Sequence, residues 1–233
     1  MFENKKCIIF DLDGTLIDSI NIWNEVDRML LTSFGIVPGD VGVERDIFFT
    51  ENKEGEIYIL YMQYLIERYF IKGVTAKELN AIRDDISKWY LEYETKMKPK
   101  ADEFLMLAKL KGFLLMLATV SSKWAIDIYC KNPNIGGKID IYNTFNGGIL
   151  TKADVEMKKP NPAIYLKAIS KSGFESSQCI AIEDSLNGII ASKAAGLDTI
   201  AIYDEYSDHD REKINKLSDY QVNNYAELIK KLI

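Results

Sequence analysis

Acidic side chains follow two short apolar runs of this sequence, at the point where each run ends. Asp11 and Asp13 come after the run Cys7–Phe10. Glu183 and Asp184 come after a second such run. Carboxylate oxygens are the ligands that Mg²⁺ prefers, usually one or two of them with waters and substrate oxygens. A carboxylate can also attack phosphorus and form an acyl phosphate, so these residue types favour metal-assisted phosphoryl transfer.

A hydroxyl and a lysine complete the set of side chains that this chemistry needs. Thr119 ends another apolar run, and Lys159 directly precedes Pro160. A lysine can neutralise a phosphate by its charge, and a hydroxyl can orient it. Histidine-based triads and multi-histidine metal sites are nearly excluded, because the only histidine of the sequence is His209 in an acidic polar stretch. The candidate reactive groups that remain are the carboxylates, the hydroxyl and the lysine.

Apolar, β-favouring runs alternate with helical patterns and must carry these side chains. Such alternation indicates an α/β fold with a doubly wound, mostly parallel sheet that helices cover on both faces. Asn161 is the expected N-cap of one helix, with proline at its first position. The expected strands are 7–10, 113–118, 179–182 and 199–203, and the expected helices of this part are 101–111, 122–131, 162–173 and 186–195.

A helical segment without strands interrupts the alternation after the first strand. Ser19 is the expected cap of its first helix, which Gly35 would stop. Residues 35–50 look irregular, because proline and glycine recur there. This segment reads as an inserted second domain with hinges near 17–19 and 96–101. Its other expected helices are 54–71 and 75–95, and the expected division is 18–96 for the insert and 1–17 plus 97–233 for the main domain.

The carboxyl ends of parallel strands should bring the reactive side chains together. Ligands of open parallel sheets bind outside these ends. Asp11 and Asp13 are two residues apart and can share one face of a frayed strand end. Gly14 then permits a sharp departure of the chain. We therefore expect Thr119 and Asp184, which follow other strands, to meet the first two carboxylates at one edge of the sheet.

Four segments, in this order, resemble the motifs of the haloacid dehalogenase (HAD) superfamily. The resemblance covers nearly all of the chain outside the inserted block, and that block has the position and helical character of the family's first-position cap. The resemblance implies a Rossmann-like HAD core with an inserted α-helical cap domain, similar to β-phosphoglucomutase and phosphoglycolate phosphatase. The segments are Asp11-Leu12-Asp13-Gly14-Thr15-Leu16, Ala118-Thr119, Lys159-Pro160-Asn161-Pro162 and Glu183-Asp184-Ser185-Leu186-Asn187-Gly188.

The resemblance implies a role for each catalytic side chain. By similarity, Asp11 attacks phosphorus. Asp13 acts first as an acid that protonates the leaving oxygen and then as a base that activates water. Thr119 binds an oxygen of the transferring phosphoryl group, and Lys159 holds the phosphate and the nucleophile by charge. An acid two residues after the nucleophile is typical of the phosphate-handling members, so halide chemistry is disfavoured.

The resemblance also implies a Mg²⁺ site. Asp11, Asp184 and the backbone carbonyl of Asp13 would be ligands. Glu183 would be either a further ligand or a carboxylate that supports the ligands. Glu183 and Asp184 could instead simply cap the helix that follows them, a role that is compatible with metal binding for one of them.

Three further residues are candidate substrate contacts. Val120 stands where the family often has asparagine, and its backbone amide could still donate to phosphate. Ser121 follows it and is also a candidate, with the start of a helix as the alternative. Arg45, in the inserted segment, could reach a second anionic group of the substrate or could be an ordinary surface arginine.

Three functions remain open at this stage. We favour a Mg²⁺-dependent phosphatase, a phosphoric monoester hydrolase, acting on a small phosphorylated metabolite through an aspartyl-phosphate. A phosphotransferase of the β-phosphoglucomutase type is the alternative. Such mutases carry a histidine in the first cap helix, and residues 20–25 contain none. A binding protein that kept the scaffold but lost turnover would be the third possibility.

Composition limits the partners and the compartment. The net charge of −6 argues against an electrostatic footprint for nucleic acid or an anionic membrane. We expect neither a signal peptide nor a membrane span near residue 1, because Asp11 and Asp13 cut the first apolar run short. Cys7, Cys130 and Cys179 have no paired or metal-type spacing, so a reducing, cytoplasmic location is expected. The oligomeric state and the identity of the substrate are left open.

Overall fold

The computed structural model describes residues 1–52 and 56–233, which divide into two compact units. One unit, here called the core unit, comprises Met1–Ile20 and Thr95–Ile233. The other, the helical unit, comprises Asn21–Glu94. The limits that the sequence suggests for the insert, 18 and 96, stay a prediction.

A six-stranded sheet forms the centre of the core unit, with β1 (Cys7–Phe10) inside it. β1 pairs with β4 (Leu114–Ala118) on one side and with β6 (Cys179–Glu183) on the other. All pairings in this sheet are parallel, and the strand order is β5-β4-β1-β6-β7-β8. The remaining strands are β5 (Gly148–Leu150), β7 (Asp198–Ile202) and β8 (Tyr220–Val222).

Each strand that the sequence predicts is present, with ends that differ by one residue at most. The sequence pattern predicts neither β5 nor β8. Both are three residues long, which is too short to carry a readable periodicity. The predicted α/β class with a mostly parallel sheet is confirmed.

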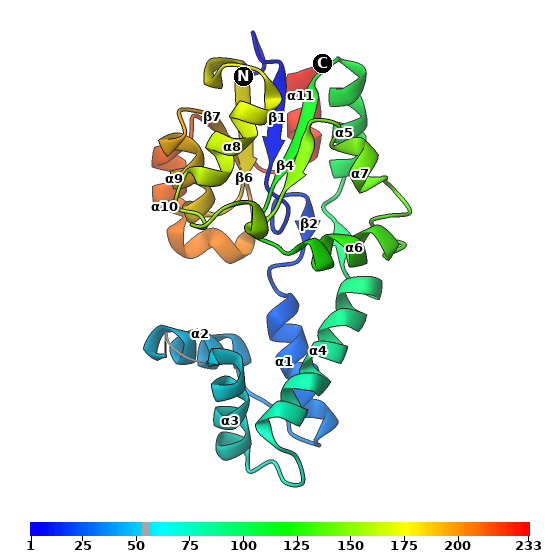
Figure 1. Ribbon diagram of the computed structural model, residues 1–233, viewed down its shortest axis with the longest axis vertical. Helices are drawn as coiled ribbons and strands as arrows, with labels where there is room; N and C mark the ends of the chain where they lie inside the picture. The colour runs from blue at the N-terminus through cyan, green and yellow to red at the C-terminus, as the bar shows by residue number, and fades with distance from the viewer. Residues whose placement is uncertain (53–55) are drawn as a thin grey trace. The chain divides into compact units, whose positions relative to one another are not determined.

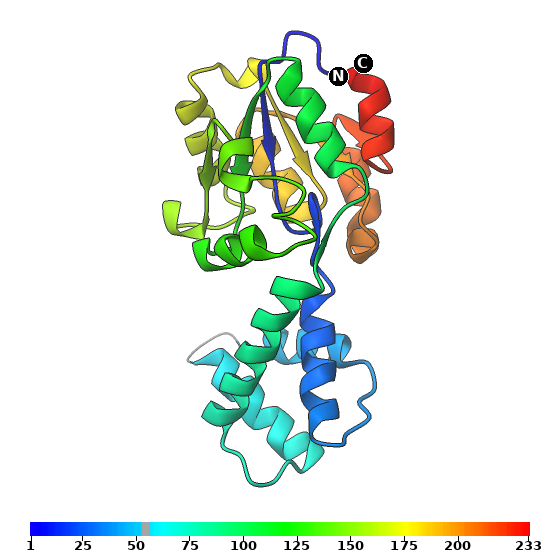
Figure 2. The same ribbon diagram turned by 90° about the vertical axis from the view of Figure 1, so that its right-hand side faces the viewer.

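Helices cover both faces of the sheet, as parallel pairing requires. α8 and α9 pack on one face, and α5 and α11 lie on the other (Figure 1 and Figure 2). The helices of the core unit are α5 (Ala101–Leu110), α6 (Lys123–Lys131), α7 (Ile141–Thr144), α8 (Ala163–Ser172), α9 (Leu186–Ala194), α10 (Arg211–Leu217) and α11 (Tyr225–Leu232), with 3₁₀ turns η1 (Lys152–Asp154), η2 (Ser176–Gln178) and η3 (Glu205–Asp210).

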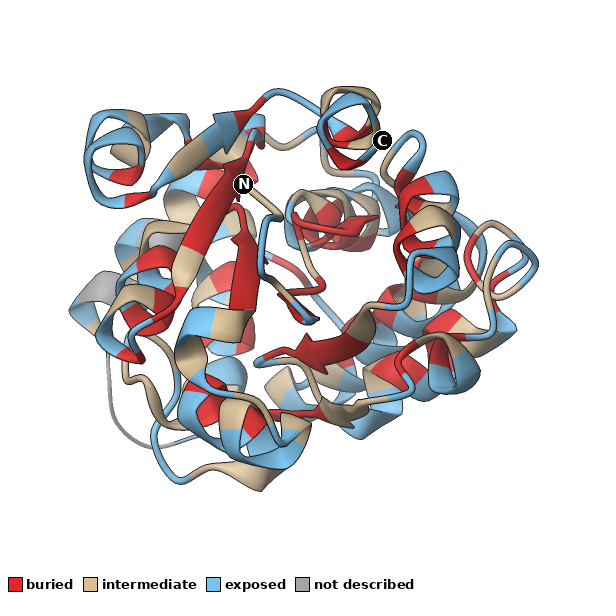
Figure 3. Cartoon of the chain, turned by 90° about the horizontal axis from the view of Figure 1, so that it is seen from above, coloured by how far each residue is buried: buried red, intermediate tan, exposed pale blue. Residues whose placement is uncertain are grey.

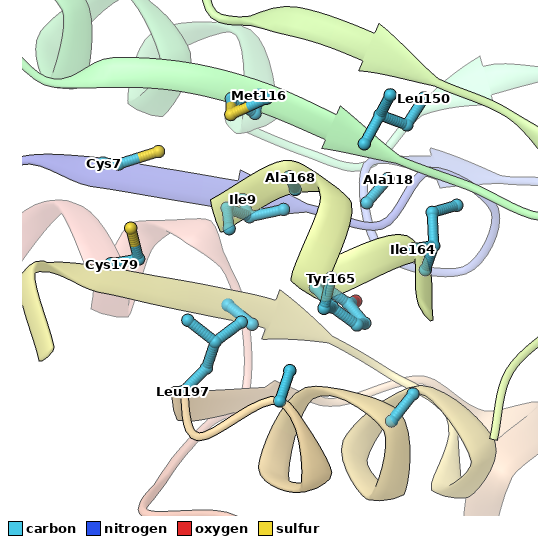
Figure 4. Packing of buried hydrophobic residues seen from close by; sticks show 13 residues of the cluster. Cys7, Ile9, Met116, Ala118, Leu150, Ile164, Tyr165, Ala168, Cys179 and Leu197 are labelled. Carbon is cyan, nitrogen blue, oxygen red and sulfur yellow. The ribbon is translucent and has the colours of Figure 1, made fainter. Parts of the chain in front are cut away.

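The central strand is buried on both faces. Cys7 and Ile9 belong to a cluster that includes Tyr165 of α8 (Figure 4), whereas Phe10 packs edge-on against Phe104 of α5, with ring centroids 6.1 Å apart. Figure 3 colours β1 and β6 as buried along their whole length, whereas β5 and β8 are only partly buried. Burial on both faces explains why this strand reads as an unbroken apolar run rather than an alternating one.

A small antiparallel ribbon lies where the chain leaves the core unit and returns to it. β2 (Ile17–Asp18) pairs with β3 (Lys96–Met97), so that Ile17 faces Met97 in register. Both of these side chains are buried. The ribbon falls on the two segments that the sequence marks as hinges, and it ties them together within the core unit.

The helical unit contains α1 (Ile22–Ser33), α2 (Val41–Glu51), α3 (Ile57–Tyr69) and α4 (Ala76–Tyr93). Leu30, Tyr61, Leu65 and Leu79 are fully buried in its core. The predicted helix 54–71 starts on two residues that lie outside the described part of the chain. In residues 1–52 and 56–233, no helix is long and apolar enough to cross a membrane.

Two local expectations for this unit are wrong. α2 forms where the sequence looks irregular, because the Asp40 side chain accepts the N–H groups of Gly42 and Val43 at 3.1 and 3.2 Å and so caps a new helix. Ser19 does not cap α1, which begins after Asn21. The hydroxyl of Ser19 is instead used in the core unit.

A fully buried carboxylate, Asp27 on α1, organises the polar interior of the helical unit. Arg83 Nε donates to its Oδ1 at 2.6 Å, and Tyr61 Oη donates to its Oδ2 at 3.1 Å. Arg45 Nη1 lies 3.4 Å from Oδ2. The Arg83 guanidinium also stacks on Trp23, 4.9 Å from the ring centroid. Paired and bonded in this way, the buried charge is tolerated.

Replacing Asp27 should destabilise the helical unit strongly. Asp27→Ala leaves the buried Arg83 guanidinium without its charge partner, so we expect the free energy of unfolding to fall by about 3 kcal/mol. This free energy is measured by urea unfolding, with far-ultraviolet circular dichroism as the signal. Asp85→Ala, at an exposed position of α4, is the matched control and should change it by less than about 0.5 kcal/mol. Equal effects of the two substitutions would contradict this account.

Candidate active site

Three neighbouring strands deliver the predicted reactive residues to one edge of the sheet. Asp11 follows β1 directly, Thr119 follows β4, and Glu183 ends β6. Because β1 lies between β4 and β6, these residues are adjacent at the carboxyl ends of the strands. The chain also changes direction across the sheet at this point, which is where open parallel sheets form ligand sites.

Lys159 joins two of the carboxylates. Its Nζ lies 2.6 Å from Asp11 Oδ1 and 2.6 Å from Glu183 Oε1, and its side chain is 5% exposed. Burial acts to lower the pKa of Lys159, but the charges of Asp11 and Glu183 outweigh it and raise that pKa. The lysine is therefore held as an ammonium ion between two acidic groups that come from different strands.

Glu183 is held by neutral donors as well as by this charge. Tyr165 Oη donates to Oε1 at 2.6 Å, and the backbone N–H of Asp184 donates to Oε2 at 3.2 Å. Gly188 of α9 leaves the space that the carboxylate fills, because a Cβ at that position would lie 1.9 Å from Oε1. Glu183 thus supports Lys159 and also offers an oxygen beside Asp11.

Asp184 is fixed by the turn that follows β1. Thr15 Oγ1 donates to its Oδ1 at 2.7 Å, and Tyr225 Oη in turn donates to the Thr15 carbonyl at 3.1 Å. Gly14 has φ +83°, and a Cβ there would lie 2.4 Å from Asp184 Oδ2. Glycine is required here on both counts, since only glycine combines this backbone conformation with so close an approach.

The charges of this cluster favour a cation. Asp11, Glu183 and Asp184 are buried and each offers an oxygen, with these atoms all within 4.8 Å of one another. Burial raises the pKa of Asp11 to about 7, against the opposing charge of Lys159. Burial and the charges of Glu183 and Asp11 raise the pKa of Asp184 well above its ordinary value. Once ionised, these carboxylates would carry more negative charge than one lysine neutralises, which suits a hard divalent ion with oxygen ligands.

Asp13 faces a set of hydroxyl groups rather than the lysine. Ser19 Oγ and Tyr129 Oη donate to its Oδ1 at 2.6 and 2.9 Å, and Ser121 Oγ donates to its Oδ2. The hydroxyl of Ser121, a candidate substrate contact, is thus hydrogen-bonded to Asp13. α6 begins one residue after Ser122, which is its N-cap.

The second predicted strand end combines buried and exposed groups. Thr119 is fully buried, and its Oγ1 accepts the N–H of Ser121 at 3.0 Å. Val120 is 40% exposed. Arg45 belongs to the helical unit, where it pairs with Asp27. The roles assigned to these residues stay predictions.

Sequence reasoning missed the residues that position the carboxylates. Tyr129 and Tyr165 lie on amphipathic helices, where an aromatic residue reads as core, and nothing in their spacing marks a polar task. Ser19 reads as a helix cap. For Thr15 a signal was available, because it stands within the first motif directly after Gly14.

Comparisons with known proteins agree on the type of protein. The family model described as "haloacid dehalogenase-like hydrolase" matches residues 5–196. Hexitol phosphatase B of Escherichia coli (strain K12) is 25% identical over 96% of this chain and 94% of its own. Protein CbbY of Rhodobacter capsulatus is 30% identical over 87% of each. The structure of CbbY from Rhodobacter sphaeroides with phosphate has a TM-score of 0.69 at 24% identity, covering 96% of both chains.

Adding a single carbon at Gly188 should disturb the cluster. Gly188→Ala drives a Cβ into the buried Glu183 carboxylate, which must move away from Lys159. We expect the free energy of unfolding to fall by about 1–3 kcal/mol, as for overpacked cores. Urea unfolding measures it. Gly39→Ala, where a Cβ meets nothing within 4 Å, is the control and should be near neutral. A neutral Gly188→Ala would show that Glu183 is not confined as described.

Proposed function

The chain belongs to the haloacid dehalogenase-like hydrolases, and we propose that it is a Mg²⁺-dependent phosphatase that hydrolyses a small phosphorylated metabolite through a phosphorylated Asp11. The predicted family is confirmed by the family model, and the predicted class, a phosphoric monoester hydrolase, is confirmed by relatives named as phosphatases. The observation that carries the finer proposal is the buried Asp11 carboxylate, 2.6 Å from Lys159 and beside two further carboxylates.

Asp11 is the proposed nucleophile. An Asp11 oxygen bonds to phosphorus while the ester bond to the leaving oxygen breaks, which leaves an acyl phosphate on the protein. Lys159 holds the attacking oxygen by its charge and offers the same charge to the incoming phosphate. Water then attacks phosphorus, and the acyl phosphate is cleaved to release inorganic phosphate and restore the carboxylate.

Asp13 is the proposed acid and base. Its carboxyl proton passes to the leaving oxygen in the first step, and its carboxylate takes a proton from the attacking water in the second. One group can serve both steps because the leaving oxygen and the water occupy the same side of phosphorus in turn. Three hydroxyl groups donate to the two oxygens of this carboxyl group and hold it in place, which supports the assignment.

The residues suit Mg²⁺. Asp11, Asp184 and the backbone carbonyl of Asp13 would hold it, with Glu183 either as a further ligand or as a support for Lys159. Such an ion supplies positive charge where phosphate oxygens meet carboxylates, which would otherwise repel. The close oxygens of three buried acidic residues support this assignment.

The remaining candidates would recognise the substrate. Thr119, Ser121 and the backbone amide of Val120 would bind phosphoryl oxygens, and Arg45 would meet a second anionic group. Hexitol phosphatase B, by its name, acts on a phosphorylated polyol, and we propose a substrate of similar size and charge. A cytoplasmic location, expected from the unpaired cysteines, belongs to the same proposal.

Mg²⁺ should stabilise the protein more at alkaline than at acidic pH. The pKa of Asp11 rises from 3.8 to about 7 on folding. Because folding raises this pKa, protonated Asp11 contributes to the free energy of unfolding of the metal-free protein. This contribution is complete below pH 3.8 and is lost as the pH rises through about 7. Above that pH the ionised cluster repels itself and binds a cation better.

Thermal unfolding with a chelator and with excess Mg²⁺, at pH 5 and pH 8, measures this effect. We expect the larger increase of Tm at pH 8. Asp184→Asn, which removes one proposed ligand, should lose most of the Mg²⁺-dependent increase at both values. An increase that is the same at both pH values in the unsubstituted protein would rule out the proposed linkage.

Asp11→Asn should abolish turnover. The amide cannot form the acyl phosphate, so hydrolysis of a generic aryl phosphate with Mg²⁺ should fall by at least about a thousandfold while the circular dichroism spectrum is retained. Asp18→Asn, at an exposed carboxylate of β2, is the control and should retain most activity. Retained hydrolysis by Asp11→Asn would refute the nucleophile.

The same assay separates the alternatives. Mg²⁺-dependent phosphate release by the unsubstituted protein supports the phosphatase. Isomerisation of a sugar phosphate that depends on a bisphosphate would instead support the mutase type. Silence on a panel of phosphorylated sugars, nucleotides and short organic acids would support a binding protein.

A further inference from the structure

The carboxylate of Asp13 is fixed by hydroxyl groups from three separate segments of the core unit. Ser19 Oγ and Tyr129 Oη both donate to Oδ1, at 2.6 and 2.9 Å. Ser121 Oγ donates to Oδ2. Both oxygens are engaged, so the plane of the carboxylate is set by its partners and not by its own torsion angles alone.

Tyr129 differs from the two serines in how firmly it is placed. A serine hydroxyl can rotate to another partner, whereas the oxygen of a tyrosine goes where its ring is packed. Tyr129 is 2% exposed, and it is one of the buried residues of α6, together with Ile126 and Ile128. Because both Asp13 oxygens are acceptors, the phenol hydroxyl of Tyr129 is the donor of this hydrogen bond.

The orientation of Asp13 matters for only part of the chemistry. Its proton must reach the leaving oxygen within hydrogen-bond distance, and a displacement of about 1 Å can cost a hundredfold in rate. A poor leaving group such as an alkoxide needs this proton as the ester bond breaks. A dinitrophenolate leaves without it.

We propose that Tyr129 is a positioning residue for Asp13, whose hydroxyl holds the carboxyl group in the orientation from which it protonates an alkoxide leaving group. The proposal rests on the proposed function, in which Asp13 is the acid. The proton moves from the Asp13 carboxyl group to the leaving oxygen as the ester bond breaks and the bond between Asp11 and phosphorus forms. Tyr129 keeps its own proton throughout.

The test compares two substrates in the Tyr129→Phe variant. kcat/KM, which reports the steps up to release of the leaving group, is measured with Mg²⁺ for an alkyl phosphate, such as a hexitol phosphate, and for dinitrophenyl phosphate. We expect about a tenfold loss for the alkyl phosphate and less than about a threefold loss for the aryl phosphate. Equal losses for both substrates, or no loss, would overturn the proposal.

Two controls separate positioning from general damage. Tyr142 Oη also donates to a carboxylate of the core unit, Asp127, at 2.6 Å, and Tyr142→Phe should leave both kcat/KM values unchanged. Thermal unfolding checks that Tyr129→Phe is folded at the assay temperature. If Tyr129→Phe is not folded at that temperature, Tyr129→Met replaces it, because this substitution also removes the hydroxyl. The same comparison applies to it, between the loss of kcat/KM for the alkyl phosphate and that for the aryl phosphate.

A double-variant cycle asks whether Tyr129 acts through Asp13. Adding Tyr129→Phe to Asp13→Asn should lower the single-turnover rate on the alkyl phosphate by less than about twofold, because the group to be positioned is already disabled. A further tenfold loss would overturn the proposal. An unsubstituted protein that hydrolyses neither phosphate would overturn the proposed function itself, whereas an active protein with equal losses overturns only the role of Tyr129.

Discussion

The burial of several carboxylates around one lysine is the constraint on which the core unit depends. Asp11, Glu183 and Asp184 are at most 7% exposed, and removal from water penalises every one of their charges. Lys159 compensates part of this cost through two contacts of 2.6 Å. With one lysine for these acidic groups, ionising all of them would leave an excess of negative charge in a small volume, which is why the pKa values of Asp11 and Asp184 are raised. Such an excess attracts positive charge, and it underlies the proposed Mg²⁺ site.

The fold supplies the space and the directions that this cluster needs. The order β4-β1-β6 sets three strand ends side by side, and each contributes a polar residue at the same edge. Gly14 leaves room for Asp184, because a Cβ at this position would lie 2.4 Å from its carboxylate. Gly188 leaves room for Glu183 in the same way, since a Cβ there would lie 1.9 Å from that carboxylate. Packing of the backbone against the carboxylates therefore fixes positions that electrostatic repulsion alone would spread apart.

Neutral hydroxyl groups complete the solvation of these acids. Thr15, Tyr165 and Tyr129 donate to Asp184, Glu183 and Asp13 in turn. A hydroxyl satisfies a carboxylate without cancelling its charge, so the site stays attractive to a cation. In the helical unit a single buried carboxylate, Asp27, has two guanidinium partners, Arg45 and Arg83. The charge of Asp27 is thus balanced within the helical unit, whereas in the core unit one lysine serves several acidic groups.

The sequence by itself determined the order of the motifs, the strands that carry them and the charged residues Asp11, Lys159 and Asp184, because an apolar run that ends in an acid is a local pattern. Only the tertiary structure decided which neutral side chains orient them. Tyr129 and Asp13 are 116 positions apart, and Thr15 and Asp184 are 169 apart. An amphipathic helix gives a buried tyrosine the same periodicity whether its hydroxyl is used or not, so the partner of that hydroxyl is set by packing between elements.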